Sequence, residues 1–408
     1  MALVMALVMA LVRRSPHAVT VPFGAMPGPR VLFDATAVPA DRGGVGRYTD
    51  ALLQALAVRG EDPVVVCQER DAAALSRLGV REVVTSPART ASRGARLVWE
   101  QTGLPALVAR VGADVLHSPH YTAPARPGAR TVVTLHDATF FTDPGVHTPL
   151  KAATFRTATR RAVRRAARCV VPSVATRDEV VRLVGADPDR VDVALHGVDA
   201  GVVAPQPPAE RARVARGLGL GDRPWIAFLA TVEPRKNVGA LVRGWVRAFA
   251  GLHAVDPAAV PALVLAGGPG WDTVLPSVLA TVPEGMPLLR PGYLPFADLP
   301  GFLAGAELVA YPSLGEGFGL PVLEGMACGT AVLTTRLLSL PEVGGDAVEY
   351  CEPDVASVAA ALHALHGDPE RRGRLGAAAR RRALGFTWDA SAAVHLRSWE
   401  RAAAGPGR

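Results

Sequence analysis

Two glutamates stand on either side of a glycine-rich turn in "SLGEGFGLPVLEGMACGT", residues 313–330. The apolar run "ELVAYPS" leads into this stretch, so Glu316 is expected at the carboxyl end of a strand. Gly317 and Gly319 allow the backbone to approach a ligand closely. Pro321 suits the first turn of a helix, where free amides and roughly half a unit of positive dipole charge favour an anion.

The second glutamate, Glu324, falls within the next helical turn. A carboxylate there would not bind a phosphate, but it can accept two hydrogen bonds from vicinal hydroxyls such as those of a ribose. Glu316, on the other side of the anion site, is suited to the hydroxyls of a sugar. Helix capping and surface charge are the alternative for both glutamates, and their placement around Gly-Phe-Gly disfavours it.

A pair of cations occurs in "ATVEPRKN", residues 230–237, again directly after an expected strand. Arg235 supplies a planar fork and Lys236 a point charge, and the two together suit a diphosphate. Asn237 is expected to begin the following helix as its N-cap. The chain has only one other lysine, Lys151, so a lysine at this position indicates that the site requires one. A solvated loop is the alternative.

The third glycine-rich segment is "RGGVGRYTDALL", residues 42–53. Its glycines precede an expected helix, so amides near Gly44 again face a possible anion. The dinucleotide fingerprint needs its glycines immediately after the first strand, and here "TAVPADR" intervenes. The glycines of "AGGPGWD", residues 266–272, also have the wrong spacing. These departures disfavour a nicotinamide-dependent oxidoreductase.

Several histidines lie at expected strand ends. His136 ends the strand of "VTLHDATFF", a position typical of a functional residue, and we predict a functional role for it. For His120 and His196, ordinary packing is the favoured interpretation. The aspartates of "DPD", residues 187–189, could suggest a metal site, but a turn is the better interpretation.

A run of cations without an acid occupies residues 151–168, an expected helix. Arg156, Arg160, Arg164 and Arg168 recur every four residues, along one helical face. Such a face could dock on an anionic membrane surface, at roughly 1 kcal/mol per cation. A solvated face in an arginine-rich protein is the alternative. The net charge of +7 suits acidic partners in general: phosphates, nucleic acid or anionic lipid.

The chain has 408 residues, which is too long for one ordinary core and suggests two domains. Hydrophobic residues make up 49%, enough for large cores. The four cysteines have no metal-ligand spacing and lie in apolar segments, as expected for buried thiols in a cytoplasmic protein.

The chain begins with "MALVMALVMALVRR", whose apolar run is too short to span a bilayer. Its arginines follow the apolar run, which is the wrong order for a signal peptide. We expect residues 1–29 to be a disordered tail or to precede the true start, for which Met26 is a candidate. A weak interfacial anchor is the alternative.

Short apolar runs alternate with helical stretches from residue 31 onwards, which predicts an α/β fold with parallel sheets. One Rossmann-like, doubly wound domain is expected over 30–200 and a second over 225–387. Residues 201–224, rich in proline and poor in periodic apolar residues, are expected to be a linker. The ligand should lie in a cleft between the domains, at the carboxyl ends of the strands.

Together these motifs resemble retaining glycosyltransferases of family 4, which have the GT-B fold. The resemblance rests on Glu-x7-Glu, "EPRKN", "GGVGRY" and "LPEVGGDA" (340–347), and it covers about residues 30–400. It implies a nucleotide-sugar donor held mainly by the second domain, and a helix over 388–403 that crosses back onto the first. It also implies retention of anomeric configuration. The acceptor would be a glycan or a lipid-linked molecule of the cell envelope.

The resemblance also implies a role for each candidate residue. Arg235 and Lys236 would hold the diphosphate, and Glu324 the ribose. Glu316 and His136 would contact the donor sugar. The remaining donor contacts would come from backbone: Gly44 in the first domain, and Gly317, Phe318, Gly319 and Leu320 in the second. His136, Glu316, Arg235 and Lys236 are thus the candidate catalytic residues. No cofactor or obligatory metal is expected, because the two cations can stabilise the leaving diphosphate, and no nucleic-acid partner is expected.

Overall similarity to bacterial mannosyltransferase-like proteins favours mannose from GDP-mannose, with a UDP-sugar as the other donor considered. A nucleotide-sugar epimerase of the same build is a second hypothesis, and a non-catalytic sugar-nucleotide binding protein is a third. The expected location is the cytoplasm. Peripheral attachment to the inner face of the membrane through the arginine helix is left open against a solvated arginine face.

Overall fold

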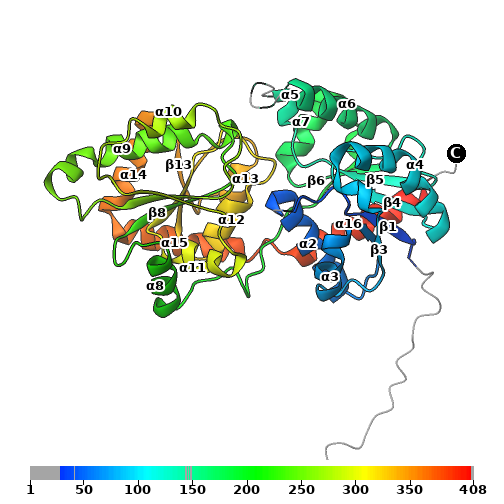
Figure 1. Cartoon of the computed structure of the whole chain (residues 1–408), viewed down its shortest axis with the longest axis horizontal. Coiled ribbons are helices and arrows are strands. Elements are labelled where there is room, and N and C mark those ends of the chain that lie inside the picture. Colours follow the sequence, from blue (N-terminus) through cyan, green and yellow to red (C-terminus); the bar gives the residue numbers. More distant parts are fainter. Residues whose placement is uncertain (1–27, 41, 143–144, 146, 148, 406–408) are drawn as a thin grey trace, which may run out of the picture.

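A computed structural model describes residues 28–40, 42–142, 145, 147 and 149–405. The chain forms two α/β domains that lie side by side, each around one sheet (Figure 1). In both sheets every neighbouring pair of strands is parallel. The expected fold class, two Rossmann-like domains, is therefore confirmed. Residues 1–27 of the expected N-terminal tail, with Met26, lie outside the described residues.

The first domain has seven strands in the order β3-β2-β1-β4-β5-β6-β7. Its elements along the chain are β1 (Val31–Asp34), α2 (Gly43–Val58), β2 (Val64–Cys67), α3 (Glu69–Arg77), β3 (Val83–Thr85), η1 (Ala88–Ala91), α4 (Arg93–Val111), β4 (Val115–Ser118), β5 (Arg130–Thr134), α5 (Thr139–Thr142), α6 (Pro149–Arg165), β6 (Arg168–Val171), α7 (Val174–Val184), η3 (Pro188–Arg190) and β7 (Val191–Val193).

The second domain has six strands in the order β10-β9-β8-β11-β12-β13. Its elements, with the helices that follow, are α8 (Pro208–Gly217), β8 (Trp225–Leu229), η4 (Pro234–Lys236), α9 (Val238–Val255), β9 (Ala262–Ala266), α10 (Leu275–Leu279), β10 (Leu288–Gly292), η5 (Phe296–Asp298), α11 (Leu299–Gly305), β11 (Leu308–Tyr311), α12 (Leu320–Ala327), β12 (Ala331–Thr335), α13 (Leu340–Gly344), β13 (Glu349–Cys351), α14 (Val355–Gly367), α15 (Pro369–Ala383) and α16 (Trp388–Ala404).

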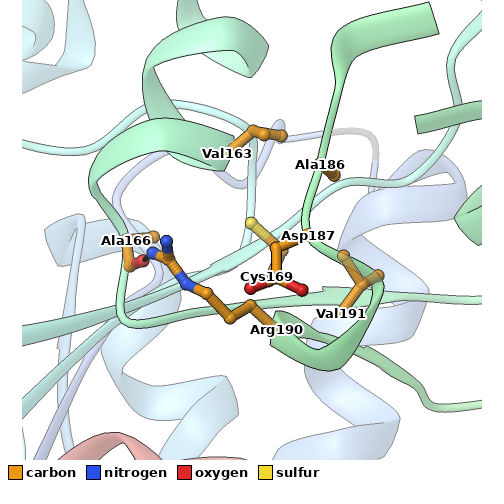
Figure 2. Close-up of a pocket in the computed structure, with 7 residues that line it drawn as sticks. All are labelled: Val163, Ala166, Cys169, Ala186, Asp187, Arg190 and Val191. Carbon is orange, nitrogen blue, oxygen red and sulfur yellow. Dashed lines mark hydrogen bonds between the residues drawn. The ribbon is translucent and has the colours of Figure 1, made fainter. Parts of the chain in front are cut away.

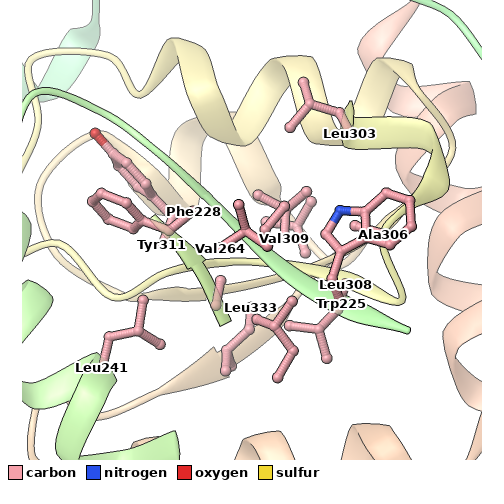
Figure 3. Packing of buried hydrophobic residues seen from close by; sticks show 14 of the residues in the cluster. Trp225, Phe228, Leu241, Val264, Leu303, Ala306, Leu308, Val309, Tyr311 and Leu333 are labelled. Atoms are coloured by element: carbon pink, nitrogen blue, oxygen red, sulfur yellow. The ribbon is translucent and has the colours of Figure 1, made fainter. Parts of the chain in front are cut away.

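The central strands are apolar on both faces because helices cover both sides of each sheet. Figure 3 shows this for the second domain, where residues of β8, β9, β11 and β12 pack with α9 and α11. Tyr311 ends β11 inside this cluster, and its hydroxyl extends beyond the apolar side chains toward the loop after the strand. The core therefore fixes the loop that follows β11.

The sequence pattern does not predict several elements at the edges of the two sheets. The apolar pattern gives no signal for α3 or β3 at one edge of the first sheet, nor for β13 at one edge of the second. Strand β3 has no fully buried residue, and α3 buries only Asp71 and Leu75. Apolar periodicity marks burial, so half-exposed edge elements carry little of it.

The expected linker over 201–224 is wrong for its middle part, which forms helix α8. The helix begins with a proline at its first position and buries Val214 and Ala215 in the core of the second domain. Val214 packs so closely on Gly301 of α11 that a β-carbon at Gly301 would lie 2.7 Å from it. With two buried side chains in ten residues, α8 is too weakly amphipathic to be recognised from periodicity.

The expected helix over 149–168 ends at Arg165. Arg168 is the first residue of β6, where its guanidinium pairs with Asp192 on neighbouring β7. The arginine face of α6 therefore includes Arg156, Arg160 and Arg164 but excludes Arg168. None of the helices in the described ranges has the length and apolarity needed to cross a membrane.

The last helix, α16, leaves the second domain and packs against α2 and strands β5 and β6 of the first (Figure 1). Where the chain crosses, Val198 donates its amide to the carbonyl of Phe386. Gly197 lies so close to Thr387 and Trp388 that a β-carbon would overlap their backbone. Two chain segments therefore connect the domains side by side.

Candidate functional site

The Arg235–Lys236 pair and Glu316 meet at the carboxyl edge of the second sheet. Nη1 of Arg235 lies 2.7 Å from Oε2 of Glu316, and Nζ of Lys236 lies 2.7 Å from Oε1. The cations follow β8 and the glutamate follows β11, which are neighbours in the sheet. Parallel neighbours end at the same edge, so two segments 80 residues apart in the chain converge.

Glu316 is ionised although it is buried. Burial by itself raises the pKa of this carboxyl, but the charges of Arg235 and Lys236 outweigh it and lower the pKa to about 2. The hydroxyls of Tyr311 and Ser313 also donate to Oε1, at 3.0 and 2.7 Å. This carboxylate therefore holds both cations at fixed positions.

The same surroundings lower the pKa of Lys236 and raise the pKa of Arg235. Burial lowers the pKa of Lys236, and Arg235 lowers it further, while Glu316 opposes both effects. Burial also acts to lower the pKa of Arg235, but Glu316, Asp137 and Glu233 raise it above its usual value. Nε of Arg235 is buried without a hydrogen-bond partner among the described residues. A buried donor of this kind is costly, so it marks a place for an acceptor atom.

The turn after Glu316 meets the first domain. The carbonyl of Gly317 accepts hydrogen bonds from Ser173 at 2.6 Å and Thr176 at 3.1 Å. A β-carbon at Gly317 would overlap the carbonyl oxygen of His136. Glycine is therefore required here by the close approach of the two domains.

The same turn leads into α12. Gly319 has φ of 101°, a left-handed conformation that favours glycine, and Leu320 begins the helix. Phe318 is buried, with its ring centroid 5.0 Å from that of His196 in the first domain. The turn thus joins the cluster of Glu316, Arg235 and Lys236 to both α12 and the domain junction.

Glu324, on α12, forms an ion pair with Arg47 of α2 in the first domain. Its side chain is only 3% exposed, whereas that of Arg47 is 26% exposed. Burial lowers the pKa of the Arg47 guanidinium. The predicted ribose-binding carboxylate is thus occupied by a cation from the opposite domain.

His136 follows β5, and its Nε2 lies 2.7 Å from the carbonyl of Pro119. A carbonyl only accepts, so Nε2 carries the proton and Nδ1 has a lone pair. Burial lowers the pKa of this imidazole, which keeps it neutral at pH 7. Gly44 is an exposed residue in the first turn of α2, and a β-carbon added to it would meet open space.

His120 and His196 are held mainly by packing. Burial lowers the pKa of His120 to about 3 and that of His196 well below its usual value. His196 stacks on Trp388 with ring centroids 5.4 Å apart. Asn237 occupies the expected N-cap position of α9, but in a left-handed conformation and without a side-chain capping bond. Its side-chain amide donates instead to the carbonyls of Pro312 and Pro353.

The "DPD" segment forms the expected turn. Oδ1 of Asp187 accepts the amide of Asp189, and Pro188–Arg190 form η3. Beside it lies a small pocket lined by Val163, Ala166, Cys169, Ala186, Asp187, Arg190 and Val191 (Figure 2). Arg190 donates to the carbonyl of Ala166 there, and burial raises the pKa of the Cys169 thiol to about 12. In the described part of the chain, no three His, Cys, Asp or Glu side chains are arranged to hold a metal ion.

Three contributors to the junction were given no role from the sequence. Arg47 and Glu342 lie within recognised motifs, but their partners are remote. Glu342, of α13, accepts the amides of Val174 at 3.0 Å and Ala175 at 3.3 Å, at the N-terminus of α7. Asp137 follows His136 and acts on the pKa of Arg235 across the junction. Spacing within one segment cannot reveal such pairs.

The two parallel sheets and the charged groups at their junction define a protein of the GT-B class. A model of "Glycosyltransferase Family 4" matches residues 42–202, and one of "Glycosyl transferases group 1" matches residues 223–368. The chain belongs to the family-4 type of glycosyltransferases.

Two curated relatives are similar over part of the chain. The O-antigen chain mannosyltransferase B of Escherichia coli is 33% identical over 261 residues, which are 63% of this chain and 66% of that protein. The D-inositol 3-phosphate glycosyltransferase of Kineococcus radiotolerans is 34% identical over 262 residues, which are 60% and 59% of the two chains. The matched part thus spans less than two thirds of each relative.

Solved structures share the fold at low sequence identity. HepE of Anabaena in complex with UDP-glucose has a TM-score of 0.71 and 17% identity, over 91% of this chain and 100% of that one. WaaG, a glycosyltransferase involved in lipopolysaccharide biosynthesis, has a TM-score of 0.71 and 16% identity, over 90% and 98% of the chains.

Proposed function

We propose that this chain is a retaining glycosyltransferase that moves a hexose from a nucleotide sugar to a glycan or lipid-linked acceptor. The observation that carries the proposal is the meeting of Arg235, Lys236 and Glu316 at one sheet edge. The unpartnered, buried Nε of Arg235 supports it, because a diphosphate oxygen would satisfy that donor.

Each candidate residue has a proposed contact. Arg235 and Lys236 bind the diphosphate, with Gly44 approaching it from the first domain. Glu324 accepts the ribose hydroxyls. Glu316 holds the two cations and contacts the sugar hydroxyls together with His136. The backbone from Gly317 to Leu320, with Phe318 and Gly319 between them, lines the sugar and phosphate.

The proposed reaction is a front-face displacement. The bond between the anomeric carbon and the diphosphate oxygen breaks, the acceptor oxygen bonds to the same face, and the acceptor proton passes to the departing diphosphate. Arg235 and Lys236 stabilise the charge that develops on the leaving group, and we expect no metal to be needed for this. Glu316, Glu324 and Asp137 are each engaged by cations or hydroxyls, which supports a route without a carboxylate nucleophile. Trapping of a covalent glycosyl-enzyme would contradict this mechanism.

The proposed donor is GDP-mannose, on the similarity to the E. coli mannosyltransferase. A UDP-sugar is the competing donor, because HepE binds UDP-glucose. The test is a screen of GDP-, UDP-, ADP- and dTDP-sugars by thermal shift and donor hydrolysis, with wild type and Lys236→Ala. One donor class should stabilise the wild type strongly and the variant barely; equal shifts for both proteins would contradict the proposed site.

The two other hypotheses give different results with donor alone. An epimerase would isomerise the sugar or release it without an acceptor. A non-catalytic binding protein would bind donor and turn over nothing even with acceptor present. The transferase should hydrolyse donor slowly and form a new glycosidic bond once an acceptor is added.

We also propose that the first domain docks on an anionic membrane surface through α6. A groove of about 1520 Å³ runs between α6, residues 121–131 and the end of α16. Arg161, Arg164 and Arg165 line it, and no ion pair is formed by these three with any described residue. This surface concentrates positive charge on the domain expected to receive the acceptor.

A further inference from the structure

Arg47 and Glu324 form an ion pair with each other, although each is suited to contact a different part of a bound donor. Glu324 is nearly fully buried, on the helix that follows the glycine turn. Arg47 comes from the opposite domain and reaches it across the junction. If Glu324 binds a ribose, as proposed above, then Arg47 occupies that place in the donor-free protein.

The backbone of Arg47 is held in place, so a change of partner requires movement of the side chain alone. The next residue, Tyr48, is 1% exposed, and its hydroxyl lies 2.9 Å from Nε2 of His395 on α16 and 3.0 Å from Oγ1 of Thr134 on β5. The arginine side chain passes near the Phe296 ring, with 5.8 Å between its guanidinium carbon and the ring centroid. The first turn of α2, with the exposed Gly44, lies directly before it.

We infer that Arg47 is a donor-binding residue that exchanges Glu324 for the diphosphate of the donor. The two ribose hydroxyls would donate to the Glu324 carboxylate and replace its hydrogen bond and ion-pair contact with the guanidinium. The released guanidinium would then bind the diphosphate, beside Arg235 and Lys236. This inference rests on the proposed function. It adds Arg47, a cation of the first domain that received no role from the motif in which it lies.

The exchange is favourable only for a complete nucleotide. A buried charge without a partner is costly. This applies fully to Glu324, whose side chain is 3% exposed, and in smaller measure to Arg47, whose side chain is 26% exposed. A ribose without phosphate would release the arginine and leave it without an anion. A diphosphate without ribose would draw the arginine away and leave the glutamate unpaired. The pair thus couples recognition of ribose and diphosphate.

Inorganic pyrophosphate contains the diphosphate without the ribose, so it probes the binding of Arg47 to phosphate separately from the binding of Glu324 to ribose. In the wild type, Glu324 holds Arg47 and pyrophosphate can meet only Arg235 and Lys236. In Glu324→Gln the arginine is released, so pyrophosphate should bind about tenfold more tightly, as expected for one additional charged hydrogen-bonded contact. In the double variant Arg47→Met/Glu324→Gln this gain should disappear. Binding is measured by calorimetry, and circular dichroism checks that each variant is folded.

The matched control is Glu342→Gln, which removes another carboxylate that connects the domains but lies on α13 and contacts α7. It should leave pyrophosphate affinity unchanged, which distinguishes release of Arg47 from general loosening of the junction. An unchanged affinity in Glu324→Gln, or a gain that survives Arg47→Met, would overturn the inference while leaving the proposed function intact. Failure of the wild type to bind any nucleoside diphosphate would overturn the proposed function as well.

Discussion

Trp399 of the last helix donates its indole N–H to Nδ1 of His117 on β4, 2.7 Å away. This bond begins a chain in which His117 contacts Thr134, Thr134 contacts Tyr48, and Tyr48 contacts His395, at 3.0, 3.0 and 2.9 Å. Nδ1 of His395 ends the chain at the carbonyl of Ser391, 2.8 Å away. An indole only donates, so Nδ1 of His117 has no proton and this histidine is neutral. A carbonyl only accepts, so Nδ1 of His395 carries a proton, and because burial lowers the pKa of His395 to about 4, its Nε2 is free of a proton and accepts from Tyr48. All five bonds then point in one direction.

The first prediction is that stability falls in mild acid. Burial lowers the pKa of His395 to about 4 and that of His117 well below its usual value of about 6.5. Between pH 6.5 and 4 the unfolded chain therefore binds more protons than the folded one. The free energy of unfolding should be highest above pH 6.5 and decrease by about 1.4 kcal/mol per pH unit for each such histidine below it. Urea unfolding at pH 7, 6 and 5 measures this.

Replacing His395 with phenylalanine should reduce that pH dependence, whereas replacing the exposed His363 with glutamine should not. A free energy of unfolding that stays constant from pH 7 to pH 5 in the wild type would contradict the neutral, buried state of these histidines.

The second prediction concerns the cation pair. Lys236→Ala removes one of the charges expected at the leaving diphosphate, and it leaves Arg235 as the cation that pairs with Glu316. We expect the rate of donor turnover to fall about a hundredfold, the usual cost of losing one group that stabilises a transition-state anion. Initial rates of donor hydrolysis measure it.

Lys151→Ala is the matched control, because Lys151 is the only other lysine in the sequence. Its ammonium lies 4.4 Å from the centroid of the Trp271 ring, and the charges of Glu233, Asp137 and Arg235 act on its pKa. This lysine is therefore near the junction, whereas Lys236 is the one that contacts Glu316. A similar loss of turnover in both variants would argue that positive charge in general, and not its position, determines the rate.

The third prediction is that Gly317→Ala damages both stability and turnover. The added methyl group would overlap the carbonyl of His136, so the two domains would have to separate locally. Overpacking of this kind costs about 1–3 kcal/mol. Thermal unfolding and donor hydrolysis test it, with Gly373→Ala as the control: that residue lies in α15 with open space around it, and alanine should be neutral or slightly stabilising there. A Gly317→Ala variant as stable as the wild type would show that the two domains are not closely packed at this glycine.

The fourth prediction concerns the membrane surface. Replacing Arg161, Arg164 and Arg165 with serine should weaken binding to vesicles that contain anionic lipid by about fivefold per arginine, because each cation contributes roughly 1 kcal/mol. Cosedimentation with anionic and neutral vesicles measures the effect. Serine at the exposed Arg374, Arg380 and Arg381 of α15 changes the net charge equally and should have little effect. Equal losses in both triple variants would indicate nonspecific attraction.

The sequence by itself determined the fold class and the motif positions. The buried strands were recognised because parallel sheets covered on both faces are continuously apolar, and the glycine turn was recognised because Gly317 and Gly319 have backbone requirements that other residues do not meet. The edge strands β3 and β13 and helix α8 were missed because half-exposed elements have weak periodicity.

Only the tertiary structure decided which charges meet. The order of strands places the loops after β8 and β11 side by side, so Glu316 pairs with Arg235 and Lys236. The approach of the two domains pairs Glu324 with Arg47. Spacing along a chain fixes the direction of side chains within one element. Contacts between elements depend on how the sheets are ordered and how the domains pack, because burying a charge requires a partner wherever the fold can provide one.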